Sequence, residues 1–387
     1  MKIFLEAFVD NNFGDNLFVH IVASKYPEHT FYMLEKEEYR ESYKILSENV
    51  KNVFLIEQKE SFLEQMDAMF VVGGDMFGDR ADYSTMLKQI RAIKRRGGIV
   101  AFLGISLFQG YSRLTWFDFR ILFSQADIIV VRESATYRQL KSNVPWANII
   151  SSADMVFSID VAKIKKVPSQ RGLLGISVRK KVQADSELFY PQYCKGVAET
   201  ACRYLEKSKE NRVKFLAFSS GKFDDGKVAE DIMNLCPPQY REYMDCVSFS
   251  GNVSDYMLEI QRCGKLLCTR FHALVFAILL KKPFVPIVYE EKMKRLLNEI
   301  GYDGIRPEYE IKFDAAQIVS GFSAESYSEH RLESYMVKAN QFFDGLDEKM
   351  RTKKINICGT LWKSVLYNIY VVKDFLLKRI YRKYFKK

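Results

Sequence analysis

The chain repeats one pattern: short apolar runs typical of buried strands alternate with longer stretches typical of helices. In the first half the apolar runs occupy residues 3–9, 31–34, 53–56, 68–72, 99–105 and 127–131. No hairpin signal separates them, and strands that alternate with helices favour parallel βαβ units in an open sheet. The first half is therefore predicted to be an α/β domain.

The same alternation restarts after a charged connector at residues 162–171. Its apolar runs occupy residues 173–178, 213–218, 246–249, 266–268 and 284–288. A chain of 387 residues is also too long for one ordinary core. We predict two Rossmann-like domains, residues 1–165 and 172–345, that face a cleft lined by the carboxyl ends of both sheets, where such folds bind ligands.

The most informative stretch is residues 266–287, in which a strand passes into a helix at Thr269-Arg270-Phe271-His272. A helix N-terminus there favours an anion, and Arg270 adds a planar fork of donors for a carboxylate or phosphate. His272 adds the side chain whose unperturbed pKa lies near neutrality. A buried histidine is often only a hydrogen-bonded core residue, but this position favours a catalytic site.

Charged residues also follow other predicted strands. Arg132, Glu133 and Ser134 follow the run at residues 127–131, and Arg179 follows the run at 173–178. A structural ion pair is one interpretation of Arg132-Glu133, and a place in the cleft is the other. Two arginines at one cleft favour anion binding, to which Lys292, after Tyr289-Glu290-Glu291, would add a third positive charge.

Two glycine-containing turns lie at strand ends of the first half. Gly14, Asp15 and Asn16 follow the first strand, where glycine permits close approach of a ligand and Asp15 is suited to capping a helix predicted over residues 15–24. Gly74 and Asp75 follow the strand at 68–72, in a turn without the Walker A or GxGxxG pattern. Each is interpreted either as substrate-binding or as an ordinary turn.

Charge and cysteine usage restrict the classes of partner. Residues 349–387 hold twelve of the 58 basic residues and one of the 48 acidic residues, so the net charge of +10 reflects a tail. Apolar residues at helical spacing predict a basic amphipathic helix over 350–387, which would either lie on an anionic membrane surface or pack back on the protein. Scattered cysteines, no signal peptide and no spanning segment predict a cytoplasmic protein without a metal site. Nucleic acid is not an expected partner.

Several motifs, in order, resemble the polysaccharide pyruvyl transferase family. They are NFGDN at 12–16, VVGGD at 71–75, RES at 132–134, ISVR at 176–179, TRFHALVFA at 269–277 and PFVPIVYEEK at 283–292. Arg-x-His-Ala followed by Pro-x-x-x-Ile-x-Tyr-x-x-Lys is the specific part, whereas the Arg-Asp usual in the family is Arg132-Glu133 here. The resemblance covers residues 3–300 and implies a fold similar to GT-B glycosyltransferases.

The resemblance implies transfer of the enolpyruvyl unit of phosphoenolpyruvate to a sugar of a surface polysaccharide or its lipid-linked precursor, without a cofactor. His272, Arg270 and Arg132 would be catalytic, with His272 acting as general acid or base. The residues implied to bind substrate are Gly14, Asp15, Asn16, Gly74, Asp75, Glu133, Ser134, Arg179 and Lys292. The inner face of the cell membrane would be a site of peripheral attachment.

Two alternatives keep the same architecture. A nucleotide-sugar-dependent GT-B glycosyltransferase would need groups for a base and a ribose, which the sequence does not identify. A non-catalytic sugar- or anion-binding module would tolerate replacement of Arg270 and His272 without a change other than in stability.

Overall fold

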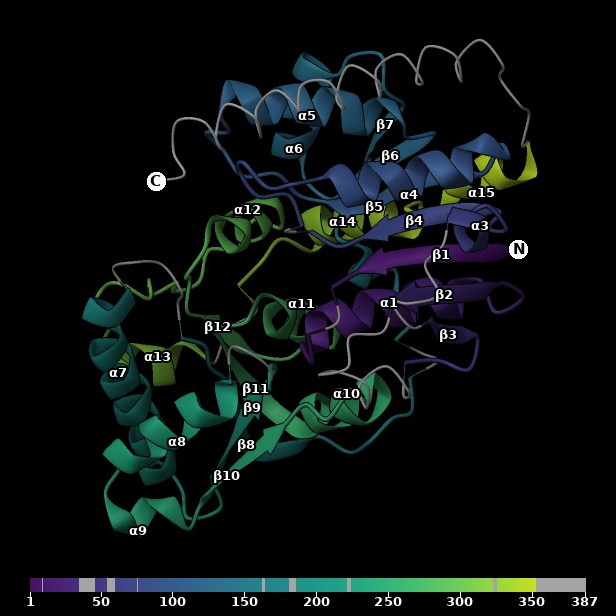
Figure 1. The fold of residues 1–387 in the computed structure, drawn as a ribbon. Coiled ribbons are helices and arrows are strands. Elements are labelled where there is room, and N and C mark those ends of the chain that lie inside the picture. The colour runs from purple at the N-terminus through teal and green to yellow at the C-terminus, as the bar shows by residue number, and fades with distance from the viewer. Residues whose placement is uncertain are drawn as a thin grey trace, which may run out of the picture.

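The computed structural model describes residues 1–8, 10–34, 46–53, 60–74, 76–161, 164–180, 186–220, 224–322 and 326–352. Within these residues the chain forms two parallel sheets with helices packed on them (Figure 1). The prediction of an α/β fold with two Rossmann-like sheets is therefore confirmed.

The first sheet has seven strands in the order β3-β2-β1-β4-β5-β6-β7, and every pairing is parallel. The strands are β1 (Lys2–Ala7), β2 (Thr30–Leu34), β3 (Val50–Val53), β4 (Ala68–Val72), β5 (Ile99–Ile105), β6 (Ile128–Val131) and β7 (Ile149–Ser151). All residues of β4, β5 and β6 are buried, as expected for strands covered by helices on both faces. The strand order reverses between β1 and β4, which places a ligand-binding crevice beyond their carboxyl ends.

The second sheet has five parallel strands in the order β10-β9-β8-β11-β12. They are β8 (Gln170–Ser177), β9 (Arg212–Ala217), β10 (Met244–Ser248), β11 (Cys263–Cys268) and β12 (Phe284–Pro286). Here the order reverses between β8 and β11, so the loops after these two strands form the second crevice. Gly14, Gly74, Arg179 and Arg270, which were predicted to be functional, follow strands at the two reversal points, whereas Arg132 follows β6 and Lys292 follows β12.

The helices that cover the first sheet come mostly from the first half of the chain. They are α1 (Phe13–Lys25), α3 (Glu60–Leu63), α4 (Ser84–Arg95), α5 (Arg113–Ser124), α6 (Ser134–Asn143) and the 3-10 helix η3 (Met155–Ser158). The later helices are α7 (Ser186–Glu206), α8 (Asp225–Leu235), α9 (Pro238–Arg241), α10 (Val253–Arg262), α11 (Phe271–Leu279), α12 (Glu291–Glu299), α13 (Ala315–Gly321), α14 (Glu329–Asn340) and α15 (Asp344–Arg351).

The last two helices return to the first sheet (Figure 1). α14 packs on η3, and α15 contacts β5 and β6. The hydroxyl of Tyr335 in α14 accepts a hydrogen bond from the backbone N–H of Asp154 at 3.2 Å, which fixes the crossing. The domain boundaries given above remain a prediction, and residues 353–387 of the predicted basic helix lie outside the described residues.

The two halves are joined at the start of α1. The backbone N–H of Phe13 donates to Phe218 O at 2.8 Å, and that of Ser220 donates to Asn11 O at 3.2 Å. The Phe13 ring packs against four aromatic rings of the second half, with centroid separations of 5.0 to 5.6 Å. Such contacts are favourable beyond the buried area, so Phe13 anchors the first half in the core of the second.

The start of α1 differs from the prediction. The helix begins at Phe13 rather than Asp15, because the Asn12 side chain, not that of Asp15, caps it by accepting from Gly14 N at 3.0 Å. Asp15 instead lies in the first turn, where the positive end of the helix dipole favours an acidic residue.

Among the described residues, no helix combines the length and apolar character that a membrane crossing requires.

Candidate functional site

The loops at the two reversal points enclose a cavity of about 210 Å³ between the halves. This is the volume of about seven molecules of liquid water, enough for a small anion. Most of the basic residues predicted from sequence line it, together with several acidic and aromatic groups. The lining residues are Phe8, Asp10, Asn12, Asp15, Phe18, Gly74, Arg132, Arg179, Phe218, Ser219, Arg270, Phe271, His272, Tyr289 and Lys292.

Arg270, directly after β11, is held by a buried carboxylate. Its Nε donates to Asp225 Oδ2 at 2.8 Å, and a second guanidinium nitrogen bonds the other oxygen of Asp225. That carboxylate also accepts from the backbone N–H groups of Phe218 and Ser219, at 3.0 and 3.1 Å. Burial lowers the pKa of Arg270, but Asp225, together with Tyr289 and Glu290, more than offsets this, so the pKa is raised.

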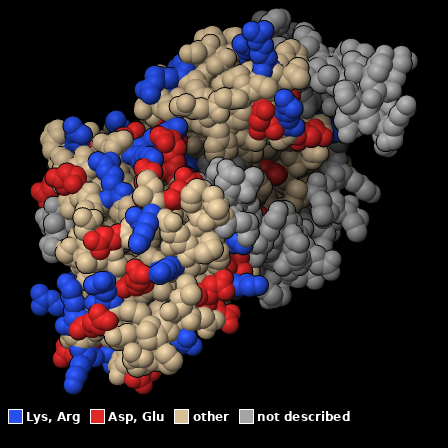
Figure 2. All heavy atoms as spheres, turned by 90° about the vertical axis from the view of Figure 1, so that its left-hand side faces the viewer, with Lys and Arg blue, Asp and Glu red and all other residues tan. Residues whose placement is uncertain are grey.

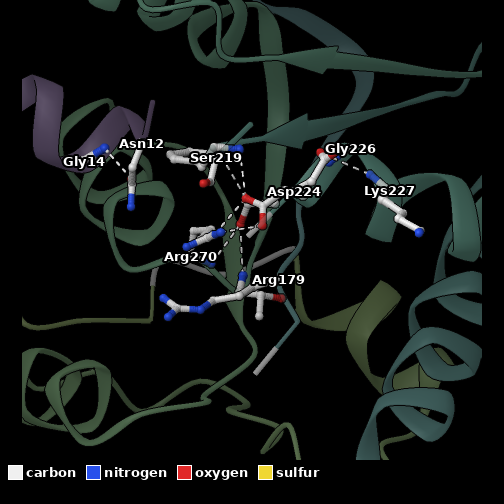
Figure 3. A network of polar contacts seen from close by, with 12 residues as sticks. Asn12, Gly14, Arg179, Ser219, Asp224, Gly226, Lys227 and Arg270 are labelled. Carbon is white, nitrogen blue, oxygen red and sulfur yellow. Dashed lines mark hydrogen bonds and ion pairs between the residues drawn. The ribbon is translucent and has the colours of Figure 1, made fainter. Parts of the chain in front are cut away.

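The bidentate pair fixes the orientation of the guanidinium at the cavity wall. Figure 3 shows Arg270 between Ser219 of one loop and Arg179 of another. The backbone N–H of Arg270 also donates to the Ser177 hydroxyl at 3.1 Å, and that of Thr269 donates to the same oxygen at 3.0 Å. The charge of Arg270 at the cavity is thus fixed before any ligand binds, although Asp225 takes two of its donors.

Arg132, directly after β6, enters the cavity from the first half. Its guanidinium donates to Asp154 Oδ2 at 3.1 Å, and both side chains are buried. Burial raises the pKa of Asp154, and the guanidinium counteracts this rise. A Cβ at Gly74 would lie 2.3 Å from a terminal nitrogen of Arg132, so the glycine after β4 makes room for this arginine.

His272 lies in the first turn of α11 and faces α1 of the other half. A Cβ at Gly14 would lie 2.1 Å from His272 Nδ1, so Gly14 makes room for the imidazole. The imidazole also packs edge-on against Phe18, with the centroids 5.2 Å apart. The position of this histidine therefore depends on residues from both halves.

Arg179 and Lys292 complete the basic wall. The Arg179 guanidinium stacks over the Tyr289 ring at 4.6 Å and donates to its hydroxyl at 2.6 Å. Lys292 Nζ lies 2.7 Å from Glu290 Oε1. The Lys292 ammonium and the Arg132 guanidinium each lie 5.4 Å from the centroid of the Phe271 ring. Burial raises the pKa of Tyr289 to about 12, so this hydroxyl remains neutral near pH 7.

Other predicted site residues lie elsewhere. Glu133 is buried, and its two oxygens are taken by the Ser106 hydroxyl and the Arg295 guanidinium, a link between the halves. Glu133 thus makes a structural ion pair, whereas Arg132 reaches the cavity, and a part of Glu133 in substrate binding stays a prediction. Ser134 is exposed and Asn16 is fully buried, and neither is among the cavity-lining residues. Asp75 lies outside the described residues.

A carboxyl group beside Glu133 is expected to make stability depend on pH. Burial, and secondarily the charge of Glu133, raise the pKa of Glu299 to about 7, while Lys338 and Arg295 oppose the rise. The folded state therefore binds a proton that the unfolded state has lost between about pH 4.5 and 7. We expect the free energy of unfolding to fall as pH rises through this window, by at most a few kcal/mol.

Urea unfolding at pH 5 and pH 8 tests this expectation. Replacing Glu299 with glutamine should reduce the difference between the two pH values, because the amide does not titrate. An equal difference in wild type and Glu299→Gln would show that other groups cause it.

Sequence reasoning did not identify Asp225 or Asp154, the partners of the two buried arginines. Asp225 begins α8 after a polar loop, and Asp154 follows the three-residue strand β7. Their position could have indicated them, because each carboxylate follows a strand, as the arginines do, and so lies near the carboxyl edge of a sheet. Within the described residues, no group of three or more His, Cys, Asp and Glu side chains is arranged to hold a metal ion.

The comparisons with known proteins agree with this architecture. The family model described as polysaccharide pyruvyl transferase matches residues 12–291, which begin at the end of the loop after β1 and include the loops after β4, β8 and β11. No curated protein sequence matches the chain.

Solved structures show the same fold at low sequence identity. The Anabaena protein Alr3699/HepE in complex with UDP and glucose is 14% identical, with a TM-score of 0.57, and the match covers 90% of this chain and all of that chain. The UDP-GlcNAc 2-epimerase of Neisseria meningitidis bound to UDP-GlcNAc is 12% identical, with a TM-score of 0.53 and coverage of 98% and 100%. A putative UDP-N-acetylglucosamine 2-epimerase from Listeria monocytogenes is 11% identical, with a TM-score of 0.52 and coverage of 92% and 99%.

Proposed function

The chain belongs to the polysaccharide pyruvyl transferase family, and we propose that it transfers the enolpyruvyl unit of phosphoenolpyruvate to a sugar, forming a pyruvate ketal and releasing phosphate. The observation that carries this proposal is the small cavity in which Arg132, Arg179, Arg270 and Lys292 meet His272. A ligand with a phosphate and a carboxylate needs several fixed cations within a few ångströms, and four positive side chains line this space.

The proposed chemistry assigns a role to each group. Protonation of the methylene carbon of phosphoenolpyruvate makes the adjacent carbon electrophilic, and a sugar hydroxyl attacks that carbon as it loses its proton. Cleavage of the bond to phosphate then lets a second hydroxyl close the ketal, so that one phosphate is released for each ketal formed. His272 is proposed to transfer one of these protons, as acid or base. The arginines and Lys292 stabilise the departing phosphate.

The fixed geometry of the cations supports this assignment. Asp225 and Asp154 hold Arg270 and Arg132 in position, so these guanidinium groups need little reorganisation when charge develops on the phosphate. Asp15, on the opposite wall, is proposed to contact the sugar. Gly14 and Gly74 would act indirectly, by leaving room for His272 and Arg132.

The direct test is phosphate release from phosphoenolpyruvate with galactose, mannose and N-acetylmannosamine acceptors, free or lipid-linked. Acceptor-dependent release would support the proposal. Absence of release, with thermal stabilisation by a UDP- or GDP-sugar and none by phosphoenolpyruvate, would favour the glycosyltransferase alternative. Absence of release with any acceptor, together with ligand binding that Arg270→Ala and His272→Ala leave unchanged, would favour a binding module.

Replacing Gly14 with alanine is expected to impair this reaction through His272. The new methyl group would occupy the position of the imidazole, so the ring must leave its present position in the cavity wall. Because a displacement of about 1 Å can cost on the order of 100-fold in rate, we expect a fall in kcat of at least about tenfold. Gly78→Ala is the matched control, since its Cβ would meet only the Ala81 Cβ at 3.9 Å. A Gly14→Ala enzyme as active as this control would contradict the role of Gly14.

We also propose that residues 350–387 attach the protein to an anionic membrane surface, where lipid-linked acceptors would be modified. The support is compositional: basic residues accompany apolar residues at helical spacing. Sedimentation with anionic liposomes, comparing the full chain with a chain ending at Gly359, measures this. The full chain should pellet with the liposomes to a greater extent than the truncated chain. Equal pelleting of the two would favour a tail that packs on the protein instead.

A further inference from the structure

A larger groove opens beside the cationic cavity. Its volume is about 690 Å³, against about 210 Å³ for the cavity, and the two share Arg179, Tyr289 and Lys292 as walls. One side of the groove is residues 106–109, directly after β5, and the other includes the start of α12 and the loop at 308–310. Volumes of roughly 300–1,000 Å³ are typical of sites that hold a small-molecule ligand. The groove therefore has room for a sugar that the cavity lacks.

The charge of the groove differs from that of the cavity. Five carboxylates line it against four basic groups, and three close ion pairs join acidic and basic members. These pairs are Lys292–Glu290, Lys294–Glu308 and Arg295–Glu133. On the molecular face in Figure 2, acidic and basic side chains are likewise interspersed. Without an excess of positive charge, this surface suits a neutral polyhydroxyl ligand rather than a phosphate.

An aromatic side chain projects at the rim of this groove. Phe108 is 51% exposed although it lies in an anchored loop. The backbone N–H of Phe108 donates to the Tyr111 hydroxyl at 3.0 Å, which in turn donates to Phe77 O at 2.6 Å. The adjacent N–H of Leu107 donates to Thr136 Oγ1 at 3.0 Å. These hydrogen bonds anchor the loop backbone, and the half-exposed Phe108 ring projects from it.

An aromatic face carries partial negative charge and attracts the polarised C–H bonds on one face of a pyranose ring. Carboxylates beside the ring accept hydrogen bonds from sugar hydroxyls. Glu291, on the α12 side of the groove, has a side chain that is 66% exposed, with one carboxylate oxygen 4.0 Å from Arg295 Nε. An aromatic platform, carboxylate acceptors and walls shared with the reaction cavity are elements that suit a site for a sugar acceptor.

We propose that this groove binds the acceptor sugar, with Phe108 stacked on its ring and the shared wall of Arg179 and Tyr289 leading its hydroxyls to the cavity. The inference rests on the proposed pyruvyl transfer, because that reaction makes the sugar an acceptor, but its test measures sugar binding alone. It makes Phe108 a determinant of acceptor affinity and not of phosphoenolpyruvate binding.

The test is a titration of the full chain with methyl glycosides of galactose, mannose and N-acetylmannosamine, followed by saturation-transfer NMR. Phe108→Ala should weaken binding of the preferred glycoside by about fivefold or more, in line with the strength of aromatic contacts. Phe108→Tyr, which keeps the aromatic ring, should bind the glycoside with wild-type affinity. Trp146→Ala is the matched control, since Trp146 is 60% exposed but precedes the amino end of β7, whereas Phe108 follows the carboxyl end of β5.

Wild-type affinity in Phe108→Ala, an equal loss in Trp146→Ala, or no binding of any glycoside to the wild type would each overturn the proposal. Phosphate release from phosphoenolpyruvate is measured on the wild type in parallel. If glycosides bind through Phe108 while phosphoenolpyruvate yields no phosphate, the groove assignment stands and the proposed reaction fails. Thermal stabilisation of Phe108→Ala by phosphoenolpyruvate should equal that of the wild type.

Discussion

Replacing His272 with glutamine is expected to lower acceptor-dependent phosphate release from phosphoenolpyruvate by about 10²- to 10⁴-fold, the usual contribution of a positioned acid or base. Glutamine keeps a polar side chain of similar length but does not transfer protons near neutral pH. Because the cations of the cavity belong to other residues, phosphoenolpyruvate should still stabilise the variant against heat. Steady-state kinetics beside a thermal shift measures both effects.

His330→Gln is the matched control for this experiment, because His330 is an exposed residue of α14. It should retain the wild-type rate. A His272→Gln enzyme that keeps more than about a tenth of wild-type kcat would remove proton transfer from the role of this residue. Loss of phosphoenolpyruvate binding instead would make His272 a ligand-binding group.

Replacing Asp225 with asparagine is expected to destabilise the fold by about 3–5 kcal/mol, the usual cost of removing one partner of a buried ion pair. The Asp225 side chain is 1% exposed and that of Arg270 is 6% exposed, so water cannot compensate the guanidinium. The two carboxylate oxygens of Asp225 accept hydrogen bonds from Arg270 and from the backbone N–H groups of Phe218 and Ser219. An asparagine has only one acceptor oxygen for these donors. The free energy of unfolding in urea measures the loss.

Glu64→Gln provides the comparison for Asp225→Asn. It also removes a carboxylate 3.0 Å from an arginine, but the side chains of Glu64 and Arg95 are 30% and 44% exposed. Such surface pairs contribute about 0–1 kcal/mol. Similar losses in the two variants would mean that burial of the Arg270 pair contributes little to stability.

The strands of both sheets were predictable where burial was continuous. β4 and β5 begin and end at the predicted residues because runs such as AMFVV and IVAFLGI have helices on both faces. β7 was missed because a strand of three residues at the sheet edge, with one residue buried, leaves almost no apolar pattern. α5 was missed as well, and no prediction covered its residues.

The candidate site was predictable in its residues but not in their partners. Arg132, Arg179, Arg270 and His272 follow strands, and parallel strands bring their carboxyl ends together. Which carboxylate holds each arginine depends on the packing of distant loops, which one sequence does not specify. Gly74 shows the same limit, since its crowding neighbour is Arg132, which follows a strand two positions away in the sheet.

The junction at Asn11–Phe13 has a consequence for engineering this protein by recombination. A chimera that joins the first half of one family member to the second half of another at the 162–171 connector would leave each sheet intact. It would nevertheless pair a foreign Phe13 with the Phe218, Phe249, Tyr256 and Phe276 pocket, and a foreign turn with His272. Recombination between relatives therefore requires residues 11–14 to be transferred together with the second half whose core they enter.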